Sequence, residues 1–385
     1  MSGSNVQASA GRVASRVDWV DAAKGICIIL VVMMHSTLGV QDRLGVGYMD
    51  WPVAFAKPFR MPDFFLLSGL FLAATINRPW ALYTDRKVVH FAYFYVLWFV
   101  IQFGLKLPIA IGELGVGGAL LAAFTDFVNP HSTLWFIYIL PFFFIATRLL
   151  RAVPVAAVFL IAVALNAAPI STGAVLIDQF ATQYVYFFAG YAFAPWIFRL
   201  AEWARSQALM AAALLGAWFL VNTFLAFTPA PAALDGFSDV LADLPLMAVA
   251  LGFAGAMAIV MFSSLLTMPT GRDWPRHVPP RPITRLLQHA GANSIAIYLA
   301  FFFPMGVTRS VLIKFVPELG SGTIALVTTT VAVLSPLALL WLINRFNLGH
   351  FLFRRPAWAV TAWKPGEREN RQNGRGPKAQ IAPAE

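Results

Sequence analysis

Two ionisable side chains lie in one long apolar stretch near the start of the chain. Residues 21–40 read DAAKGICIILVVMMHSTLGV, with Lys24 near one end and His35 deep inside. At about 100° and 1.5 Å per residue, this spacing places both side chains on one helix face, about 16 Å apart. Asp21 falls close to the same face, one turn before Lys24. The spacing therefore predicts a line of polar groups from Asp21 and Lys24 to His35.

Such a line suits group-transfer chemistry. A neutral imidazole takes a proton from a hydroxyl group near physiological pH, and a lysine ammonium binds phosphate as a point charge. A long phosphorylated donor that enters at Lys24 would bring its reactive end to His35. The alternative is a histidine that joins two helices by hydrogen bonds. Because ionisable residues inside a membrane are costly, we favour the functional interpretation.

The elements that carry these residues are membrane helices. Of the 385 residues, 59% are hydrophobic and 12% are charged, and the mean hydropathy is +0.70. A helix that spans a bilayer needs about 20 apolar residues. The sequence predicts an all-α integral membrane protein with a bundle of about ten transmembrane helices. The expected spans are 24–41, 58–77, 88–107, 132–149, 153–169, 180–199, 207–228, 244–267, 290–314 and 321–344.

The distribution of basic residues predicts the orientation. With both termini in the cytoplasm, 22 of the 28 Lys and Arg residues fall on the cytoplasmic side, as membrane proteins prefer. The net charge of +10 would also suit a nucleic-acid-binding protein. We exclude that class, because the basic residues lie in short loops between spans, where they set the orientation. We expect a polar N-terminus at 1–13, a membrane domain at 14–345 and a basic, largely disordered cytoplasmic tail at 346–385.

A second basic group stands at the start of the third expected span. Arg86, Lys87 and His90 would lie at the cytoplasmic boundary, where they are suited to bind donor phosphates alongside Lys24. The alternative is that they anchor the helix at the membrane surface.

Three polar residues of the second expected span are candidates for binding the acceptor. Arg60 and Asp63 flank its outer entry, and Arg60 breaks the charge asymmetry. Arg60 could bind an anionic or sugar acceptor, or the pair could form a helix-end salt bridge, which is common and weak. Ser68, next to Gly69, either lines a site or permits close helix packing.

No metal is expected at this site. Cys27 is the single cysteine, which excludes an intrachain disulfide and a cysteine-based metal site. No set of three histidine or carboxylate residues has the spacing of metal ligands.

The stretch RVDWVDAAKGICIILVVMMHS resembles the opening of the acyltransferase-3 family of integral membrane O-acyltransferases, and Lys in place of Arg resembles its fucose-acetylase-like subgroup. Three later stretches are also similar to family segments: PFRMPDFFLLSGLFL at 58–72, TLWFIYIL at 133–140 and GANSIAIYL at 291–299. Two positions depart from the family pattern. Lys87-x-x-His90 replaces an R-x-x-R pattern, and Ala300 and Phe301 stand where many members have a histidine.

The resemblance implies an acyl-CoA-dependent O-acyltransferase of the bacterial inner membrane. It would move an acyl group, most simply acetyl from acetyl-CoA, to a sugar hydroxyl of a cell-envelope or exported glycan or of a lipid-linked sugar. In this interpretation Lys24, Arg86 and Lys87 hold the CoA phosphates, with His90 in the same motif, and Asp21 fixes Lys24. His35 is the general base, or carries the acyl group itself. No bound cofactor is expected. A small-molecule exporter and a non-catalytic scaffold remain as alternatives.

Overall fold

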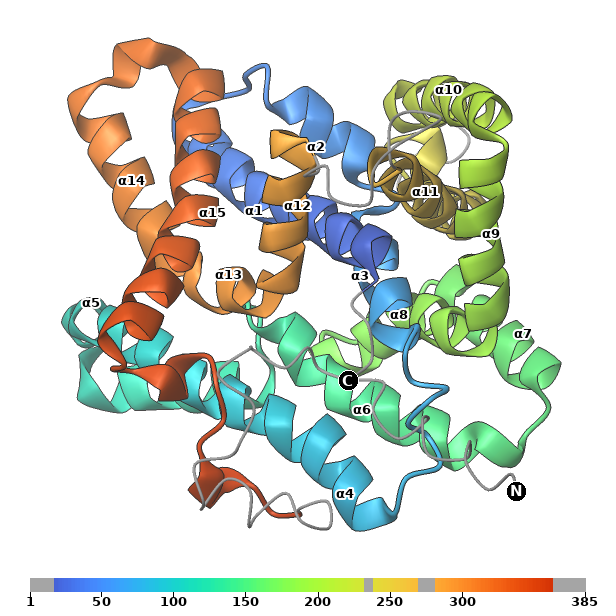
Figure 1. The fold of residues 1–385 in the computed structure, drawn as a ribbon. Helices are drawn as coiled ribbons and strands as arrows, with labels where there is room; N and C mark the ends of the chain where they lie inside the picture. The colour runs from blue at the N-terminus through green and yellow to red at the C-terminus, as the bar shows by residue number, and fades with distance from the viewer. Residues whose placement is uncertain (1–16, 232–237, 269–280, 363–385) are drawn as a thin grey trace, which may run out of the picture.

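The computed structural model describes residues 17–231, 238–268 and 281–362, and this part of the chain is helical (Figure 1). The only β contact in it is an isolated bridge between Pro229 and Val240. The helices are α1 Asp18–Leu44, α2 Asp50–Ala56, α3 Arg60–Gly69, α4 Trp80–Thr84, α5 His90–Val128, α6 Trp135–Leu149, α7 Val155–Ala167, α8 Val175–Ala192, α9 Ala194–Ser206, α10 Ala208–Phe227, α11 Pro245–Leu266, α12 Pro282–Ala292, α13 Ser294–Ala300, α14 Phe302–Phe315 and α15 Gly320–Phe346.

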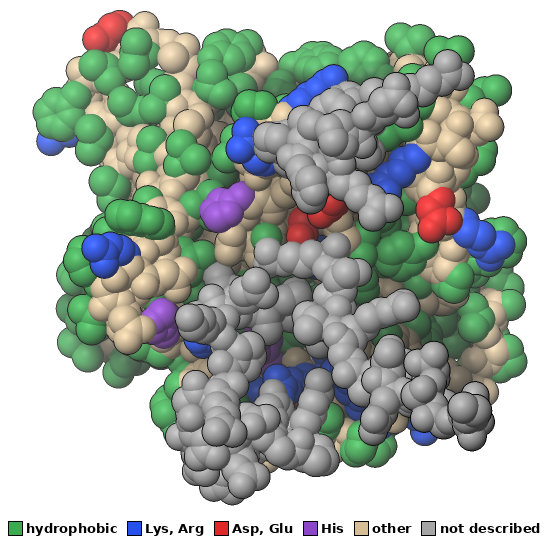
Figure 2. Space-filling view, in the orientation of Figure 1, with side chains coloured by type: hydrophobic (Ala, Val, Ile, Leu, Met, Phe, Trp, Pro, Cys, Tyr) green, Lys and Arg blue, Asp and Glu red, His purple; other side chains and the backbone are tan. Residues whose placement is uncertain are grey.

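Several of these helices are long and apolar enough to cross a membrane, which makes the chain a multi-pass membrane protein. Hydrophobic side chains dominate its surface in the space-filling view (Figure 2). Six helical segments meet this criterion. Helices α13 and α14, which are bent by 52° relative to each other, form a seventh span if they are counted together. The six continuous spans are Asp18–Leu44, Trp80–Val128, Trp135–Ala152, Ala208–Phe227, Pro245–Leu266 and Pro317–Phe346.

The expected spans that are missing from this count are short or broken. The second expected span is helical only as far as Gly69, at the end of α3. The fifth is the 13-residue helix α7. The sixth is divided between α8 and α9, where Pro195 begins a new helix because it cannot donate the backbone hydrogen bond that would continue the old one. Length and composition alone therefore identify six or seven spans, and the count of ten stays a prediction.

Helix α1 occupies the centre of the bundle and packs against α3, α11, α12 and α15. Its approach to α12 depends on two glycines. A Cβ at Gly25 would lie 2.1 Å from the carbonyl oxygen of Leu287, and a Cβ at Gly291 would clash with the carbonyl of Asp21. Glycines permit such close packing between membrane helices. The contact brings the junction of α12 and α13 next to Asp21 and Lys24.

The start of α8 is fixed by the loop before it. The Asp178 carboxylate accepts hydrogen bonds from the backbone N–H groups of Thr172, at 2.8 Å, and Gly173, at 3.0 Å. These bonds, with a further one from the Thr172 hydroxyl, lower the pKa of Asp178. Because the start of α8 is fixed, the positions of Gln179 and Gln183, which lie in its N-terminal half, are fixed as well.

Residues 350–361 pack across α5, and we call them the C-terminal strap. The Trp98 indole N–H donates to the carbonyl of Leu352 at 2.9 Å, and the Tyr93 hydroxyl donates to Phe351 at 3.0 Å. The sequence predicts these residues as part of the largely disordered basic tail. In the structure this first portion of the tail is packed against α5. The portion beyond residue 362 lies outside the described residues.

A buried ion pair holds the strap in place. Asp85 is fully buried in a π-helical turn, Asp85–Val89, just before α5. The Arg355 guanidinium donates to the Asp85 carboxylate at 2.5 Å and to the Asp85 carbonyl at 2.8 Å. The backbone N–H and hydroxyl of Thr361 donate to the other carboxylate oxygen at 2.7 and 2.8 Å. Both oxygens of this buried carboxylate are thus hydrogen-bonded.

We expect Arg355→Ala to destabilise the protein strongly, because it removes the closest cation of the buried Asp85 carboxylate and leaves it with the more distant Arg86, whose Nε lies 3.7 Å away. Removing one partner of a buried pair costs about 3–5 kcal/mol. The free energy of unfolding in detergent micelles, measured by chemical denaturation, checks this. The control is Lys57→Ala, which removes an exposed ion pair with Asp243 and should change stability by about 1 kcal/mol or less. Equal effects of the two substitutions would contradict the prediction.

Candidate functional site

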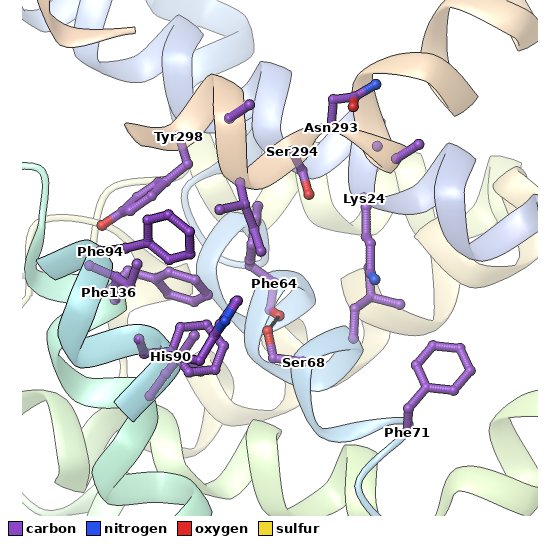
Figure 3. Close-up of a pocket in the computed structure, with 18 of the residues that line it drawn as sticks. Lys24, Phe64, Ser68, Phe71, His90, Phe94, Phe136, Asn293, Ser294 and Tyr298 are labelled. Carbon is purple, nitrogen blue, oxygen red and sulfur yellow. Dashed lines mark hydrogen bonds between the residues drawn. The ribbon is translucent and has the colours of Figure 1, made fainter. Parts of the chain in front are cut away.

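A cavity of about 110 Å³ surrounds Lys24, and we call it the lysine cavity (Figure 3). Asp21 and Lys24 reach it from α1, and Asn293 and Ser294 reach it from the junction of α12 and α13. The π-helical turn supplies Lys87, and α5 begins with His90. Half of the remaining lining residues are aromatic. In Figure 3, Lys24 and Phe71 lie at one side of the cavity, with Phe136 and Tyr298 at the other.

The two ammonium groups of this cavity lie near aromatic rings. Lys24 Nζ is 5.8 Å from the ring centre of Phe71, and Lys87 Nζ is 4.9 Å from that of Phe144. Lys87 is only 3% exposed. Rings attract cations through their electron-rich faces and leave the charge in place. Two such cations around one small cavity favour an anionic ligand.

The structure brings most of the predicted donor-site residues together. Asp21, Lys24, Lys87 and His90 all line the lysine cavity. Arg86 does not line it, and its Nε lies 3.7 Å from the Asp85 carboxylate. The reason is local geometry, since successive residues of a helical turn point in different directions.

His35 opens into a different cavity, of about 300 Å³, which we call the histidine cavity. Its polar lining comes from His35 on α1, Arg60 on α3, Thr133, and Gln179 and Gln183 on α8. The ring of Trp135 forms part of it as well. The His35 ring is therefore accessible to a small molecule and is not enclosed by packed side chains.

One neighbour of His35 is a residue that departs from the family pattern. The ring centre of Phe301 lies 5.6 Å from that of His35, at an interplanar angle of 35°. The position where many acyltransferase-3 sequences have a histidine is thus next to His35. Because the Phe301 side chain cannot accept or donate a proton, it does not provide a second base next to the His35 imidazole.

Arg60 brings a buried positive charge to the histidine cavity. Its side chain is 8% exposed, and its hydrogen bond to the Val53 carbonyl is long, at 3.5 Å. Its Nε has no hydrogen-bond partner in the described protein, and neither has the buried Oε1 of Gln183. These groups have donor and acceptor capacity left for a ligand.

The other predicted acceptor residues are placed differently. Asp63 is buried and lines neither cavity, and among the described residues it forms no ion pair with Arg60. The helix-end salt bridge considered from the sequence is therefore absent. Ser68 lines the lysine cavity, on the donor side of the site. Its neighbour Gly69 packs tightly, since a Cβ there would lie 2.1 Å from the Phe187 carbonyl oxygen.

Three aromatic residues, Phe64, Phe136 and Tyr298, line both cavities, and we call them the aromatic wall. The ring centres of Phe64 and Phe136 lie 4.8 Å apart, and those of Phe136 and Tyr298 lie 5.5 Å apart. The Tyr298 hydroxyl donates a hydrogen bond to the carbonyl of Thr133. The expectation of one open path from Lys24 to His35 is therefore corrected. The two residues share a helix, but rings from α3, α6 and α13 divide the space in front of it.

Sequence reasoning missed several lining residues. Gln179 and Gln183 are spaced four apart in an apolar stretch, which was a detectable signal for one polar helix face. Phe136, Asn293 and Ser294 lie inside stretches that carried the family resemblance. Phe64 also lies inside such a stretch, residues 58–72, but phenylalanine is abundant throughout the chain and this one did not stand out among the others.

Comparisons with known proteins agree with this architecture. The family model described as an acyltransferase domain, of the acyltransferase-3 type, matches residues 17–345. Inner membrane protein YcfT of Escherichia coli (strain K12) is 26% identical over 176 residues, which cover 39% of this chain and 49% of that protein. The match therefore spans about half the length of this curated relative. No solved structure is significantly similar to the chain.

The arrangement predicts that the two cavities open to opposite faces of the membrane. Cys27 is the single cysteine and is buried, so Cys27→Ser gives a background for labelling. We expect a small impermeant methanethiosulfonate reagent to label Ser294→Cys from one face and His35→Cys from the other. Intact spheroplasts and inverted vesicles provide the two faces.

Ala22→Cys is the control for this experiment. Ala22 is fully buried on the same helix and lines neither cavity, so it should remain unlabelled from both faces. Labelling of Ser294→Cys and His35→Cys from the same face only would contradict the prediction.

Proposed function

The chain belongs to the acyltransferase-3 family, and from that premise we propose that this membrane acyltransferase O-acetylates a sugar hydroxyl of a cell-envelope or exported glycan. Acetyl-CoA is the proposed donor. One observation carries the proposal: His35 opens into a polar cavity, while two lysines line an adjoining cavity on the other side of a thin aromatic wall.

The lysine cavity is suited to the donor. At about 110 Å³ it is too small for the whole acyl-CoA molecule, so only the part of the donor next to the lysines would occupy it. Lys24 and Lys87 would attract the phosphates, and a point charge tolerates their many orientations. Asp21 lies in the same cavity one turn before Lys24 and would orient it. Arg86, 30% exposed beside Asp85, is placed to meet the nucleotide outside the cavity.

The histidine cavity is suited to the acceptor. The amides of Gln179 and Gln183 and the indole of Trp135 line it. Amide groups pair with sugar hydroxyls, and an aromatic face packs against the apolar face of a sugar ring. Arg60 adds a donor group for an anionic substituent of the acceptor.

In the proposed reaction His35 takes the proton from the acceptor hydroxyl as its oxygen attacks the thioester carbonyl. The carbon–oxygen bond forms and the carbon–sulfur bond breaks. The proton passes from His35 to the CoA thiolate, so atoms and charges balance. In a two-step variant the His35 nitrogen accepts the acyl group first and the acceptor then removes it. Phe301 beside His35 leaves the imidazole as the single base at that point.

The topology belongs to the same proposal. Ten spans with both termini in the cytoplasm would place the lysine cavity on the side where acetyl-CoA is made. The distribution of 22 of 28 basic residues supports it. A bacterial inner-membrane location is supported by the name of the relative YcfT, an inner membrane protein. The exporter and scaffold interpretations are disfavoured, because the matching family model describes an acyltransferase domain.

We expect His35→Ala and His35→Gln to lower acetyl transfer at least 100-fold, because general-base catalysis contributes about 10²–10⁴-fold. Transfer of radiolabelled acetyl from acetyl-CoA to envelope glycans by the purified full chain measures this. Size-exclusion chromatography in detergent verifies that the variants remain folded. His131→Ala, at an exposed position, should retain wild-type activity. Normal transfer by His35→Ala would exclude the proposed role.

The two neighbouring cations should differ in their effect on the donor. Lys87 lines the lysine cavity and Arg86 does not. Hydrogen bonds to charged groups contribute about 1.5–3 kcal/mol, so we expect Lys87→Ala to raise the KM for acetyl-CoA about 10-fold or more. Arg86→Ala should raise it less than about 3-fold, because Arg86 is partly exposed and lies outside the cavity. Initial rates at varied acetyl-CoA concentration give both values. Equal effects would show that the cavity does not define the donor site.

A further inference from the structure

The two cavities meet only at the aromatic wall. Among the described residues, Phe64, Phe136 and Tyr298, labelled in Figure 3, line both cavities, and the Phe136 ring contacts the rings of the other two. Under the proposed function, the donor enters past Lys24 and its thioester reacts beside His35. The acyl group must therefore pass or displace this wall in every turnover.

The reaction chamber itself does not restrict the size of the acyl group. The histidine cavity, at about 300 Å³, is nearly three times as large as the lysine cavity, at about 110 Å³. A chain longer than acetyl would find room once its carbonyl had reached His35. The narrowest point on the path is the wall between the cavities.

The three rings of the wall are held to different degrees. Tyr298 is buried and is fixed by its hydrogen bond to the Thr133 carbonyl. Phe136 is buried between Phe64, Tyr298 and Phe65, whose ring centre is 4.8 Å away. Phe64 is only partly buried, and among the described residues its one ring contact is with Phe136. Phe64 is the ring that can turn aside with the least loss of packing.

We propose that the aromatic wall selects the acyl group by size, that acetyl is preferred over longer chains, and that Phe64 is the residue that determines this specificity. The inference rests on the proposed function. The physical cause is steric, since Phe64 must turn far enough to admit the acyl group and each further methylene requires a larger displacement. In packed sites one methylene changes discrimination about 10–200-fold.

The same wall separates the thioester from water in the histidine cavity. If Phe64 is removed, water can attack the carbonyl in place of the acceptor. Its oxygen then bonds to the carbonyl carbon, the carbon–sulfur bond breaks, and the products are a carboxylic acid and CoA thiol. Hydrolysis without acceptor is thus a second readout of an open wall.

The experiment compares acetyl-, butyryl- and hexanoyl-CoA with the purified full chain and an envelope extract from cells that lack the protein as acceptor. We expect the wild-type kcat/KM to fall at least 100-fold from acetyl to butyryl. In Phe64→Ala the difference should shrink to within about 5-fold, since the ring that must turn is absent. Release of CoA from acetyl-CoA without acceptor should rise in this variant. Phe64→Tyr keeps the ring and should keep the wild-type preference.

Phe91→Ala is the matched control. Phe91 lines the lysine cavity but not the histidine cavity, so its truncation removes an equal side-chain volume without opening the wall. We expect its ratio of acetyl to butyryl transfer to match the wild type, whatever its absolute rate. If Phe91→Ala relaxes the ratio as much as Phe64→Ala does, cavity size and not the wall sets the specificity, and the proposal is wrong.

Each remaining outcome also supports or overturns the proposal. A folded Phe64→Ala that keeps the wild-type preference overturns the proposal. If that variant fails to fold by size-exclusion chromatography, Phe64→Leu replaces it, and it should relax the ratio at least 5-fold. A wild-type protein that transfers butyryl as well as acetyl overturns the selection while leaving the proposed function intact. A wild-type protein without turnover of any acyl-CoA overturns the proposed function itself, and the inference with it.

Discussion

The close contact of α1 with α12 determines where the α12–α13 side of the site lies. Helices in lipid gain little from burying apolar side chains against one another, so their association depends on close packing. Gly25 and Gly291 provide it, each beside a backbone carbonyl of the opposite helix. This contact brings Asn293 and Ser294 to Lys24 and sets the direction of α13, which carries Tyr298 into the aromatic wall. The donor cavity and its closed end therefore follow from one helix–helix contact.

The wall also separates charges that attract different ligands. Lys24 and Lys87 lie on one side of it, and Arg60 lies on the other. Electrostatic attraction is strong where water is excluded, so a single open cavity with three cations would draw the CoA phosphates as far as His35. Under the proposed function, the division would keep the donor phosphates beside the lysines and leave Arg60 to the acceptor. The geometry thus favours two different substrates that meet at one imidazole.

The sequence predicted those parts of the site that depend on a single helix. Lys24 and His35 do lie on one long helix, α1, because their apolar surroundings and spacing leave few alternatives. Lys87 and His90, predicted to lie near Lys24, also line the lysine cavity, and their binding of the donor stays a prediction. The wall could not be predicted, since Phe64, Phe136 and Tyr298 come from three helices whose relative positions only tertiary packing determines. The span count differed for a similar reason. Hydropathy detects apolar stretches, but it does not detect that α3 ends at Gly69 or that α8 ends at Ala192 and α9 begins at Ala194, just before Pro195.

The C-terminal strap connects the stability of the fold to the donor cavity. Arg355 and Thr361 hold Asp85 at the start of the π-helical turn that also contains Lys87. The strap contributes Phe353 to the lining of the lysine cavity, where its ring stacks on Trp98. A π-helical turn has weaker internal hydrogen bonding than a regular helix and often marks a functional position. Here the strap supplies the missing restraint from outside the helix. The position of Lys87 therefore depends on residues more than 250 positions later in the chain, which lie beyond the predicted membrane domain.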